Sequence, residues 1–467
     1  MKKILCFLLA VMLIVCTGSI AVVSASSDFV IKDGVLVDYT GTASYVEIPE
    51  NVYYIGDNAF EGNTNIQTVM VTNNVKYIGN KAFYNCTGLK ALGGFSDVSF
   101  VGAFALDGTP YLKGLTGEFV NLNGVLIKYN GTSSSVSIPS EIKSIAPYVF
   151  YNNKTITNVS FSSETFDIGE GAFYGCTSLQ YVTIPKSVTS IGANAFKDTP
   201  WLTSKTGQVV VGNGILIAYN GNEETVSVKS SVKKIAPYSF FENTSVKVVD
   251  MPSSVTMVGL RAFFGCSSLK SVNYSTSLKF IDEEAFAKCS SLDNIILPKT
   301  VEHIGKGAFA SCSSVMKAEI GGNLDTLSYG AFADCQNLKS IYVKDGLKEI
   351  EDNSFYGCSN LAKLRLPDTV SSMSDNAFNN CNTAVYSPDS QYITNYCNSK
   401  NIKSSFELGD VYTDGMLTIV DCSFIQMHVS KLFTLNSEQI ELADADYDGQ
   451  VTIQDATFAQ MKIAKLL

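Results

Sequence analysis

The sequence predicts a repeat solenoid of short β-strands, turns and short helices, followed by a small all-α module that binds calcium. Two observations predict this fold. Six cysteines between Cys266 and Cys381 recur every 23 residues, each three positions after a phenylalanine. A fixed period of about 20 to 50 residues is typical of stacked structural units. From residue 409 the pattern changes to a segment that is repeated once at an offset of 34 residues.

One unit of the array is clearest between Ile281 and Ile304. The spacing of Leu292, Ile295 and Leu297 places apolar side chains on one side of a short strand. Pro298 then ends the strand, because proline has no N–H group to donate to a ladder. Each unit therefore has one apolar side, which it cannot bury alone.

Neighbouring units must stack to share one core. Phe286 and Cys289 are expected on the turn opposite the strand, with their side chains packed inward. Following the phenylalanine along the chain predicts thirteen coils, at Phe60, Phe83, Phe104, Phe150, Phe173, Phe196, Phe240, Phe263, Phe286, Phe309, Phe332, Phe355 and Phe378.

A second period of 90 residues interrupts the first half of the array, where Gly34, Gly124 and Gly214 each begin a Gly-Val/Ile-Leu motif. Each motif leads into a Tyr-Thr-Gly or Tyr-Asn-Gly tripeptide that starts at Tyr39, Tyr129 or Tyr219, and Asn-Gly is a strong turn signal. These segments are predicted to be three hairpin insertions that project from the stack, with turns at the tripeptides.

The fixed Ile-Gly, Ala-Phe, Cys, Leu and Ile-Pro positions resemble the BspA-like (Treponema-type) leucine-rich repeat family. The resemblance covers roughly Phe29 to Phe406. It implies a strand, helix and strand that close the array between Val385 and Phe406, and a flexible linker is the second interpretation of that stretch. The predicted domains are a signal peptide at 1–25, the array at 26–383, a C-terminal cap at 384–406 and the calcium module at 409–467.

Evenly spaced cysteines in a secreted protein also suggest a disulfide ladder. Equivalent positions on adjacent coils lie about 5 Å apart, but parallel side chains disfavour the disulfide dihedral angle. Buried free thiols that act as small hydrophobic groups are the favoured interpretation. A zinc site is the least favoured, since the two histidines, His303 and His428, join no cysteine cluster.

The N-terminus has the pattern of a secretory signal peptide, with Lys2 and Lys3 before an apolar run and a small-residue site at Ala25. Cys16 follows Val15 rather than a small residue, which argues against a lipid anchor. The net charge is −10, and without the two lysines it is −12. This charge disfavours nucleic acid as a partner, and no later run is long enough to span a membrane. The protein is expected to be secreted.

The repeated C-terminal segment has the spacing of two calcium loops. A loop of about 12 residues supplies oxygen ligands from its first, third, fifth, seventh, ninth and twelfth positions, with glycine at the sixth. The expected ligands of the first loop are Asp410, Asp414, the Met416 carbonyl, Thr418 and Asp421. Those of the second loop are Asp444, Asp446, Asp448, the Gln450 carbonyl, Thr452 and Asp455. Tyr412 occupies the third position of the first loop, so that site is expected to bind calcium more weakly.

Each loop is followed by apolar spacing that suits one helix, and no helical pattern precedes Asp410. This loop and helix pair resembles a type I dockerin, the module that attaches cellulosomal proteins to cohesin domains of scaffoldins. The resemblance implies a cohesin partner, contacted in two equivalent orientations. The implied partner-binding residues are Ile419, Val420, Gln426 and Met427 in one half, and Ile453, Gln454, Gln460 and Met461 in the other.

The array itself shows no catalytic pattern. No carboxylate pair is marked out for glycoside hydrolysis, and His303 lies on an ordinary repeat position. The position between the two apolar strand residues of each coil is instead expected to face outward as a candidate ligand face. Its members are Asn273, Ile296, Glu319, Tyr342 and Arg365.

The sequence therefore predicts a secreted, noncatalytic binding or adhesion protein of a cellulosome-like complex, active in polysaccharide degradation. The complex would be free or at the cell surface. The repeats would bind a plant polysaccharide or a surface protein. The alternative is a cellulosomal hydrolase, a glycoside hydrolase or peptidase-related subunit, with an unrecognised active site. Trp201, the single tryptophan, is expected to pack beside Pro200 rather than to present a platform for sugar.

Overall fold

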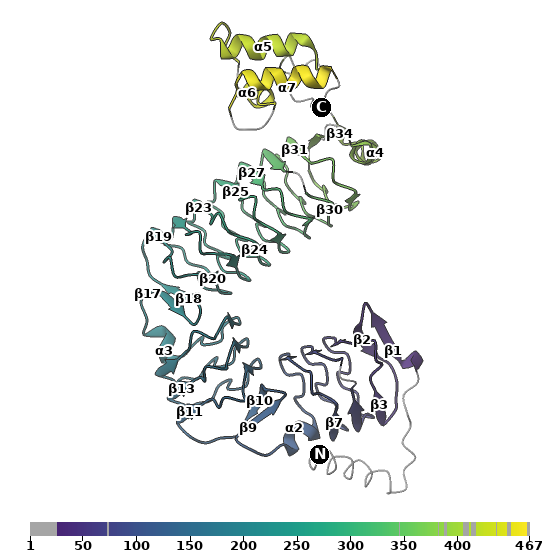
Figure 1. Cartoon of the computed structure of the whole chain (residues 1–467), viewed down its shortest axis with the longest axis vertical. Helices are drawn as coiled ribbons and strands as arrows, with labels where there is room; N and C mark the ends of the chain where they lie inside the picture. The colour runs from purple at the N-terminus through teal and green to yellow at the C-terminus, as the bar shows by residue number, and fades with distance from the viewer. Residues whose placement is uncertain are drawn as a thin grey trace. The chain divides into compact units, whose positions relative to one another are not determined.

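The computed structural model describes residues 26–71, 74–344, 346–381, 383–386, 390–404, 411, 417–435, 437–445 and 450–464. The predicted signal peptide lies outside these residues. The chain divides into two compact units, Met1–Asn220 and Gly221–Leu467. In both units consecutive coils lie side by side, and most coils add one short strand to each of two parallel ladders (Figure 1). This arrangement is the predicted solenoid.

In the first unit, ladders of three-residue and two-residue strands run along different sides of the coils. The three-residue strands are β3 (Tyr45–Glu47), β5 (Thr68–Met70), β7 (Ala91–Gly93), β11 (Ser135–Ser137), β13 (Asn158–Ser160) and β15 (Tyr181–Thr183). The two-residue strands are β4 (Tyr54–Ile55), β6 (Tyr77–Ile78), β8 (Phe100–Val101), β12 (Ser144–Ile145), β14 (Asp167–Ile168) and β16 (Ser190–Ile191). Short helices η1 (Ser26–Asp28), α2 (Pro110–Gly114) and α3 (Pro200–Thr203) flank the hairpins described below.

The second unit continues the same two ladders within itself. Its longer strands are β19 (Thr225–Ser227), β21 (Val248–Asp250), β23 (Ser271–Asn273), β25 (Asn294–Ile296), β27 (Lys317–Ile320), β29 (Ser340–Val343) and β31 (Lys363–Arg365). Its two-residue strands are β20 (Lys234–Ile235), β22 (Met257–Val258), β24 (Phe280–Ile281), β26 (His303–Ile304), β28 (Thr326–Leu327), β30 (Glu349–Ile350) and β32 (Ser372–Met373).

The core of the coils is a column of stacked phenylalanine rings, as predicted. In the second unit, the ring centroids of Phe263 and Phe286 are 5.0 Å apart with planes 3° from parallel. Those of Phe286 and Phe309 are 5.4 Å apart. The ring of Phe286 is fully buried, and its backbone N–H donates to the Ala308 carbonyl of the next coil at 2.8 Å. Offset parallel rings at this spacing stabilise one another beyond simple area burial.

Phe104 was wrongly predicted to belong to this column. It lies two positions before the repeat spacing, has a left-handed backbone with φ of 55°, and stacks on Tyr148 at 4.9 Å. Leu106, which is 3% exposed, occupies the buried position 23 residues after Phe83. The strict period therefore identifies the core residue of this coil more reliably than the residue type does.

The three hairpins are present, but their turns and their placement differ from the prediction. They are β1 (Phe29–Lys32) with β2 (Val35–Tyr39), β9 (Phe119–Leu122) with β10 (Val125–Tyr129), and β17 (Gly207–Val211) with β18 (Ile215–Asn220). The second turn lies at Asn123 and Gly124, whose φ angles of 46° and 85° suit a two-residue hairpin turn.

The first two hairpins also join the ladder instead of projecting from it. Strand β2 pairs in parallel with β4, and β10 with β12. The reason lies in the core, because the ring of Tyr129 lies 4.9 Å from that of Phe150 and continues the aromatic column. The Tyr-Asn-Gly tripeptide thus ends a strand, and its tyrosine fills the position of a repeat phenylalanine.

The cysteines described by the structure are free thiols, as favoured from the sequence. The Cys289 thiol is fully buried and donates to the Phe263 carbonyl of the preceding coil at 3.2 Å. Burial raises the pKa of the Cys266 and Cys335 thiols to about 12. At the end of the column, a hydrogen bond from the Cys358 thiol lowers the pKa of the half-buried Cys381 thiol.

The array ends in β33 (Ala384–Tyr386), α4 (Gln391–Lys400) and β34 (Lys403–Ser404). Strand β34 pairs in parallel with β33, and the Tyr396 hydroxyl donates to the Ser374 carbonyl at 2.7 Å. The Tyr396 ring lies 6.2 Å from Phe378 and covers the end of the phenylalanine column. This segment therefore shields the last coil from water, as a cap does.

Three helices follow, α5 (Ile419–Val429), α6 (Ser437–Ala443) and α7 (Ile453–Ile463). Helices α5 and α7 contact each other along their length (Figure 1). Their shared core is small, formed by Val411, Cys422, Ile425, Leu435, Ala443, Ala456 and Ala459. Within the described ranges, none of the helices has the length and hydrophobicity needed to cross a lipid bilayer.

Replacing Phe309 by alanine is expected to destabilise the array by roughly 3 to 5 kcal/mol, because it removes a buried ring and leaves a cavity. Denaturant-induced unfolding followed by circular dichroism measures this loss. Ile296→Ala is the control, since the Ile296 side chain is 59% exposed and its removal should change stability by less than about 0.5 kcal/mol. Equal effects of the two substitutions would contradict the role of the column.

Iodoacetamide is expected to alkylate Cys381 in the native protein, while Cys266 and Cys335 remain unmodified in mildly alkaline solution. The thiolate is the reactive form. Burial raises the pKa of the inner thiols and so lowers their thiolate fraction at any pH below it, whereas the pKa of Cys381 is lowered. Peptide mapping measures the modification. All these cysteines should react after unfolding without reductant, and residues that stay unmodified would indicate disulfides.

Candidate functional site

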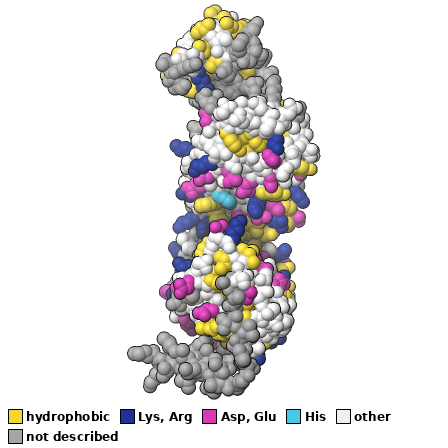
Figure 2. Space-filling model, turned by 90° about the vertical axis from the view of Figure 1, so that its right-hand side faces the viewer, with side chains coloured by type: hydrophobic (Ala, Val, Ile, Leu, Met, Phe, Trp, Pro, Cys, Tyr) yellow, Lys and Arg dark blue, Asp and Glu magenta, His cyan; other side chains and the backbone are white. Residues whose placement is uncertain are grey.

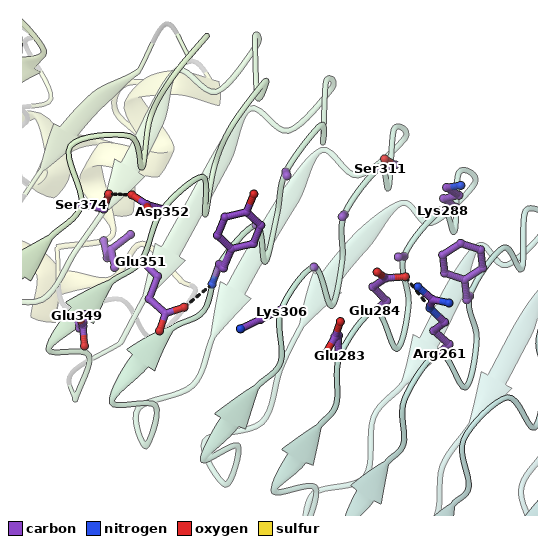
Figure 3. A pocket seen from close by; sticks show the side chains of 18 of the residues that line it. Arg261, Glu283, Glu284, Lys288, Lys306, Ser311, Glu349, Glu351, Asp352 and Ser374 are labelled. Atoms are coloured by element: carbon purple, nitrogen blue, oxygen red, sulfur yellow. Dashed lines mark hydrogen bonds and ion pairs between the residues drawn. The ribbon is translucent and has the colours of Figure 1, made fainter. Parts of the chain in front are cut away.

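A groove of about 1060 Å³ crosses several coils of the second unit (Figure 3). Its walls carry five acidic and three basic side chains and two aromatic rings. The acidic residues are Glu283, Glu284, Glu349, Glu351 and Asp352, and the basic ones are Arg261, Lys288 and Lys306. Figure 2 shows charges of both signs intermingled on one face of the molecule.

One end of the groove is built around a cation and aromatic cluster. The Arg261 Nε donates to Glu284 Oε2 at 2.7 Å. The Arg261 guanidinium and the Lys288 ammonium lie 5.4 and 5.0 Å from the centre of the Phe264 ring. That ring also stacks on Phe241 at 5.4 Å. The hydrogen bond to Glu284 raises the pKa of Arg261, which stays charged at any physiological pH. This end of the groove is pre-ordered, and the Glu284 carboxylate offsets one of the two positive charges of Arg261 and Lys288.

The opposite end is acidic. Glu349 and Asp352 are exposed, and Glu351 is half-buried. Glu351 Oε2 accepts a hydrogen bond from the Tyr329 backbone N–H at 2.7 Å, and the Ser374 hydroxyl donates to Asp352. Figure 3 shows these carboxylates at the end away from Arg261, with Lys306 between the two ends. The groove therefore has an uneven distribution of charge along its length.

The hollow exists because three consecutive coils carry alanine where other coils carry an aromatic residue. Phe264 and Tyr356 occupy this repeat position in the flanking coils, and Ala287, Ala310 and Ala333 occupy it between them. Three positions earlier, Gly307 and Gly330 have φ angles of 61° and 63°, and Tyr148 and Tyr238 occupy the same position in other coils.

Gly330 leaves the space above the floor open, whereas a Cβ atom added at Gly307 would lie 3.3 Å from the Glu284 Cγ atom. A Cβ atom added at Gly330 would meet only the Ala333 Cβ within 4 Å, at 3.8 Å. At the equivalent Gly171 of the first unit, an added Cβ would lie 2.3 Å from the Tyr148 ring. Sequence reasoning missed this site because it followed the constant positions of the repeat. The consecutive alanines at a variable position were the signal that could have found it.

The predicted ligand face lies on a different ladder. Ile296, Glu319, Tyr342 and Arg365 are register partners on β25, β27, β29 and β31. Asn273 lies on β23, which belongs to a separate sheet, so the row is interrupted before Ile296. Ile296 and Asn273 are exposed, and the Arg365 guanidinium lies 4.9 Å from the centre of the Tyr342 ring. The side chains of this predicted ligand face point outward, as expected. On β25 to β31 they lie on the surface of one sheet and do not line a groove.

The eight predicted partner-binding residues lie on α5 and α7. Ile419 and Ile453, which are 60% and 54% exposed, occupy the first turn of the two helices. Val420, Gln454 and Met461 are also exposed, while Gln426, Met427 and Gln460 are half-buried. The two helices thus present equivalent exposed side chains.

Four of the predicted calcium ligands within the described ranges lie at the helix starts. Thr418 and Thr452 cap α5 and α7, and their backbone N–H groups donate to Asp421 and Asp455 at 2.9 and 2.7 Å. Both carboxylates are fully buried. Asp444 and Gln450 belong to the second loop. Five predicted ligands lie outside the described residues, namely Asp410, Asp414, Met416, Asp446 and Asp448.

The remaining residues singled out from the sequence have structural roles. Trp201 is 6% exposed and packs edge-on against Phe196 at 4.9 Å, so it belongs to the core. His428 Nδ1 accepts a hydrogen bond from the Leu435 backbone N–H at 3.2 Å. His303 is exposed on β26. Among the described residues, no three His, Cys, Asp or Glu side chains gather in an arrangement that could hold a metal ion.

Comparisons with known proteins identify the array. The family model of the BspA type leucine rich repeat region matches residues 37–118, 128–208, 217–339 and 325–441. The chain is similar to a leucine rich repeat protein of T. pallidum, with 28% identity over 41% of this chain and 90% of that one and a TM-score of 0.35.

Similarity over more of the chain is found with two other solved structures. The pneumococcal vaccine antigen PcpA is 20% identical over 80% of this chain and 91% of its own, with a TM-score of 0.34. A leucine rich cell surface protein of Faecalibacterium prausnitzii A2-165 is 21% identical over 81% of this chain and 97% of its own, with a TM-score of 0.29. No curated protein matches the chain. Because the family model matches well over half of its residues, the chain belongs to the BspA type leucine rich repeat family.

Proposed function

We propose that this protein is a secreted, noncatalytic binding protein that attaches to a cellulosome-like scaffold through a calcium-dependent, dockerin-like module. The observation that carries the attachment is the equivalence of α5 and α7. Each begins with a threonine cap and a buried aspartate and presents an exposed isoleucine in its first turn. Two matching faces on one small module suit a dedicated attachment site.

The binding role of the array is supported by its family and by its surface. Repeat solenoids of this kind generally bind ligands along extended surfaces. The groove between Arg261 and Asp352 is such a surface, and the row on β25 to β31 is a second one. A polysaccharide or a surface protein remains the proposed class of ligand for the array. No observation on the described residues favours the alternative of a hydrolase.

The donor set of the module suits calcium. The described candidate ligands, Thr418, Asp421, Asp444, Gln450, Thr452 and Asp455, all offer oxygen atoms, which calcium prefers. When bound, calcium would offset the negative charge of the aspartates in the two loop sequences. Asp421 and Asp455 are held in place by the threonine N–H groups, so each helix start fixes the position of one carboxylate.

Removal of calcium with EDTA is expected to unfold the module and to abolish capture by a panel of immobilised cohesin domains. The module has a small core, so ion binding contributes much of its folding free energy. A ligand at about 100 times its dissociation constant contributes roughly 2.7 kcal/mol. Pull-down with and without calcium measures the effect, and capture that survives excess EDTA would refute the proposal.

Insoluble cellulose and xylan in the same pull-down assay test whether the array binds a polysaccharide. Release of reducing sugar by the purified protein would refute the noncatalytic role.

Asp455→Ala is expected to reduce calcium affinity more than Asp421→Ala does. Both substitutions remove the same hydrogen bond at a helix start, which should lower the free energy of unfolding by about 1 kcal/mol in each case. Each variant is therefore the control for the other. The second loop has aspartate at its third position, where the first has Tyr412, so it should contribute the tighter site. Calorimetric titration with calcium measures both affinities. Equal losses would show that the two sites are equivalent.

A further inference from the structure

We infer that the groove between Arg261 and Asp352 binds an extended peptide segment whose two ends carry opposite charges. The basic residues of the segment would lie over Glu349, Glu351 and Asp352, and its acidic end near Lys288 and Lys306. This inference rests on the proposed binding role of the array and names the ligand class of one surface.

The length of the groove suits a short extended chain. Phe264 and Tyr356 stand at the same repeat position four coils apart. Adjacent coils in a parallel ladder are about 4.8 Å apart, so the alanine floor between these two rings is about 19 Å long. An extended peptide rises about 3.3 Å per residue, so roughly six residues span this distance.

The depth of the groove admits a backbone but few large side chains on its floor. Gly307, Gly330, Ala310 and Ala333 form that floor, to which the two left-handed glycines add no side chain and the two alanines add only a methyl group. In an extended chain successive side chains point to opposite faces. Small residues facing the floor, with longer residues facing solvent or the charged walls, would satisfy this shape.

The charge pattern favours a peptide over a polysaccharide. Plant cellulose and xylan backbones are neutral and use open aromatic faces for stacking. Here the Phe264 ring is covered by Phe241, Arg261 and Lys288, which leaves Tyr329 as the one exposed aromatic ring of the groove lining, too few for a row of stacked sugars. An acidic polysaccharide would be repelled by the three carboxylates at one end. A segment with charges of both signs pairs with both ends.

Selection from a random octapeptide display library by the full-length protein tests the inference. The expected result is enrichment of peptides with basic residues near one end and acidic residues near the other. The double substitution Glu349→Lys and Glu351→Lys should lower the affinity for these peptides about tenfold or more, because it reverses the charge of the acidic end. The double substitution Ala310→Tyr and Ala333→Tyr should lower the affinity to a similar extent, because the two rings would fill the groove floor. Other coils already accommodate tyrosine at this repeat position, at Tyr151, Tyr174 and Tyr356.

Matched control variants lie at exposed positions of the first unit. Glu61→Tyr adds a tyrosine at the equivalent repeat position, and Glu164→Lys reverses a charge outside the groove. Both should leave peptide affinity unchanged. Circular dichroism and thermal unfolding verify that all variants fold.

Three results would overturn the inference. They are enriched peptides without opposite charges at their ends, peptides insensitive to the groove variants, and no enrichment at all. A parallel titration with cellohexaose and xylohexaose separates this failure from that of the proposed function. Binding of either sugar that the groove variants abolish would replace the peptide by a carbohydrate and retain the binding role of the array. Absence of any ligand, together with retained capture by cohesin, would leave the attachment role alone.

Discussion

The stacking of one aromatic ring per coil, in most coils a phenylalanine, is the interaction on which the rest of the array depends. A coil of 23 residues has too little apolar surface to fold alone, and the ring of Phe286 is buried only because Phe263 and Phe309 lie against its two faces. The cysteine three positions later supports the same column. The Phe263 carbonyl accepts both the Cys266 backbone N–H and the Cys289 thiol, so a small hydrophobic side chain also satisfies a buried acceptor. This double role gives a physical reason for cysteine at that position.

A constant core leaves the outward positions free to vary. Because adjacent coils pair in register, a change at one repeat position alters a column of side chains rather than an isolated point on the surface. The groove arises in this way, from alanine at three consecutive coils and glycine at two. Arg261 and Glu284 precede the two glycines in the same column, and Glu283, Lys306 and Asp352 share the column beside it. The same scaffold therefore supports a hollow on one ladder and the row of Ile296, Glu319 and Tyr342 on another.

The repeat fold could be predicted from the sequence because its period fixes the core. The failures have identifiable physical causes. Two Asn-Gly pairs lie in the second hairpin segment, at Asn123 and Asn130, and local turn preference cannot choose between them. Tertiary packing decides, because Tyr129 is needed against Phe150. The groove was missed for a related reason. It forms where alanine and glycine replace larger residues at variable repeat positions, and the sequence interpretation followed the constant positions. The candidate partner residues on α5 and α7 could be placed because the 34-residue duplication fixes equivalent positions in both helices.

The in-register pairing of the coils also bears on how such an array can change its length. Duplication or loss of one whole 23-residue unit would preserve the hydrogen-bond register and the aromatic column on both sides of the event. It would lengthen or shorten any surface column by about 4.8 Å. A step of another length needs a compensating loop, as between Tyr129 and Phe150, which are 21 residues apart and still in ring contact. Recombination within the gene can therefore change the length of a binding surface in steps of one coil, while the packing of the core stays the same.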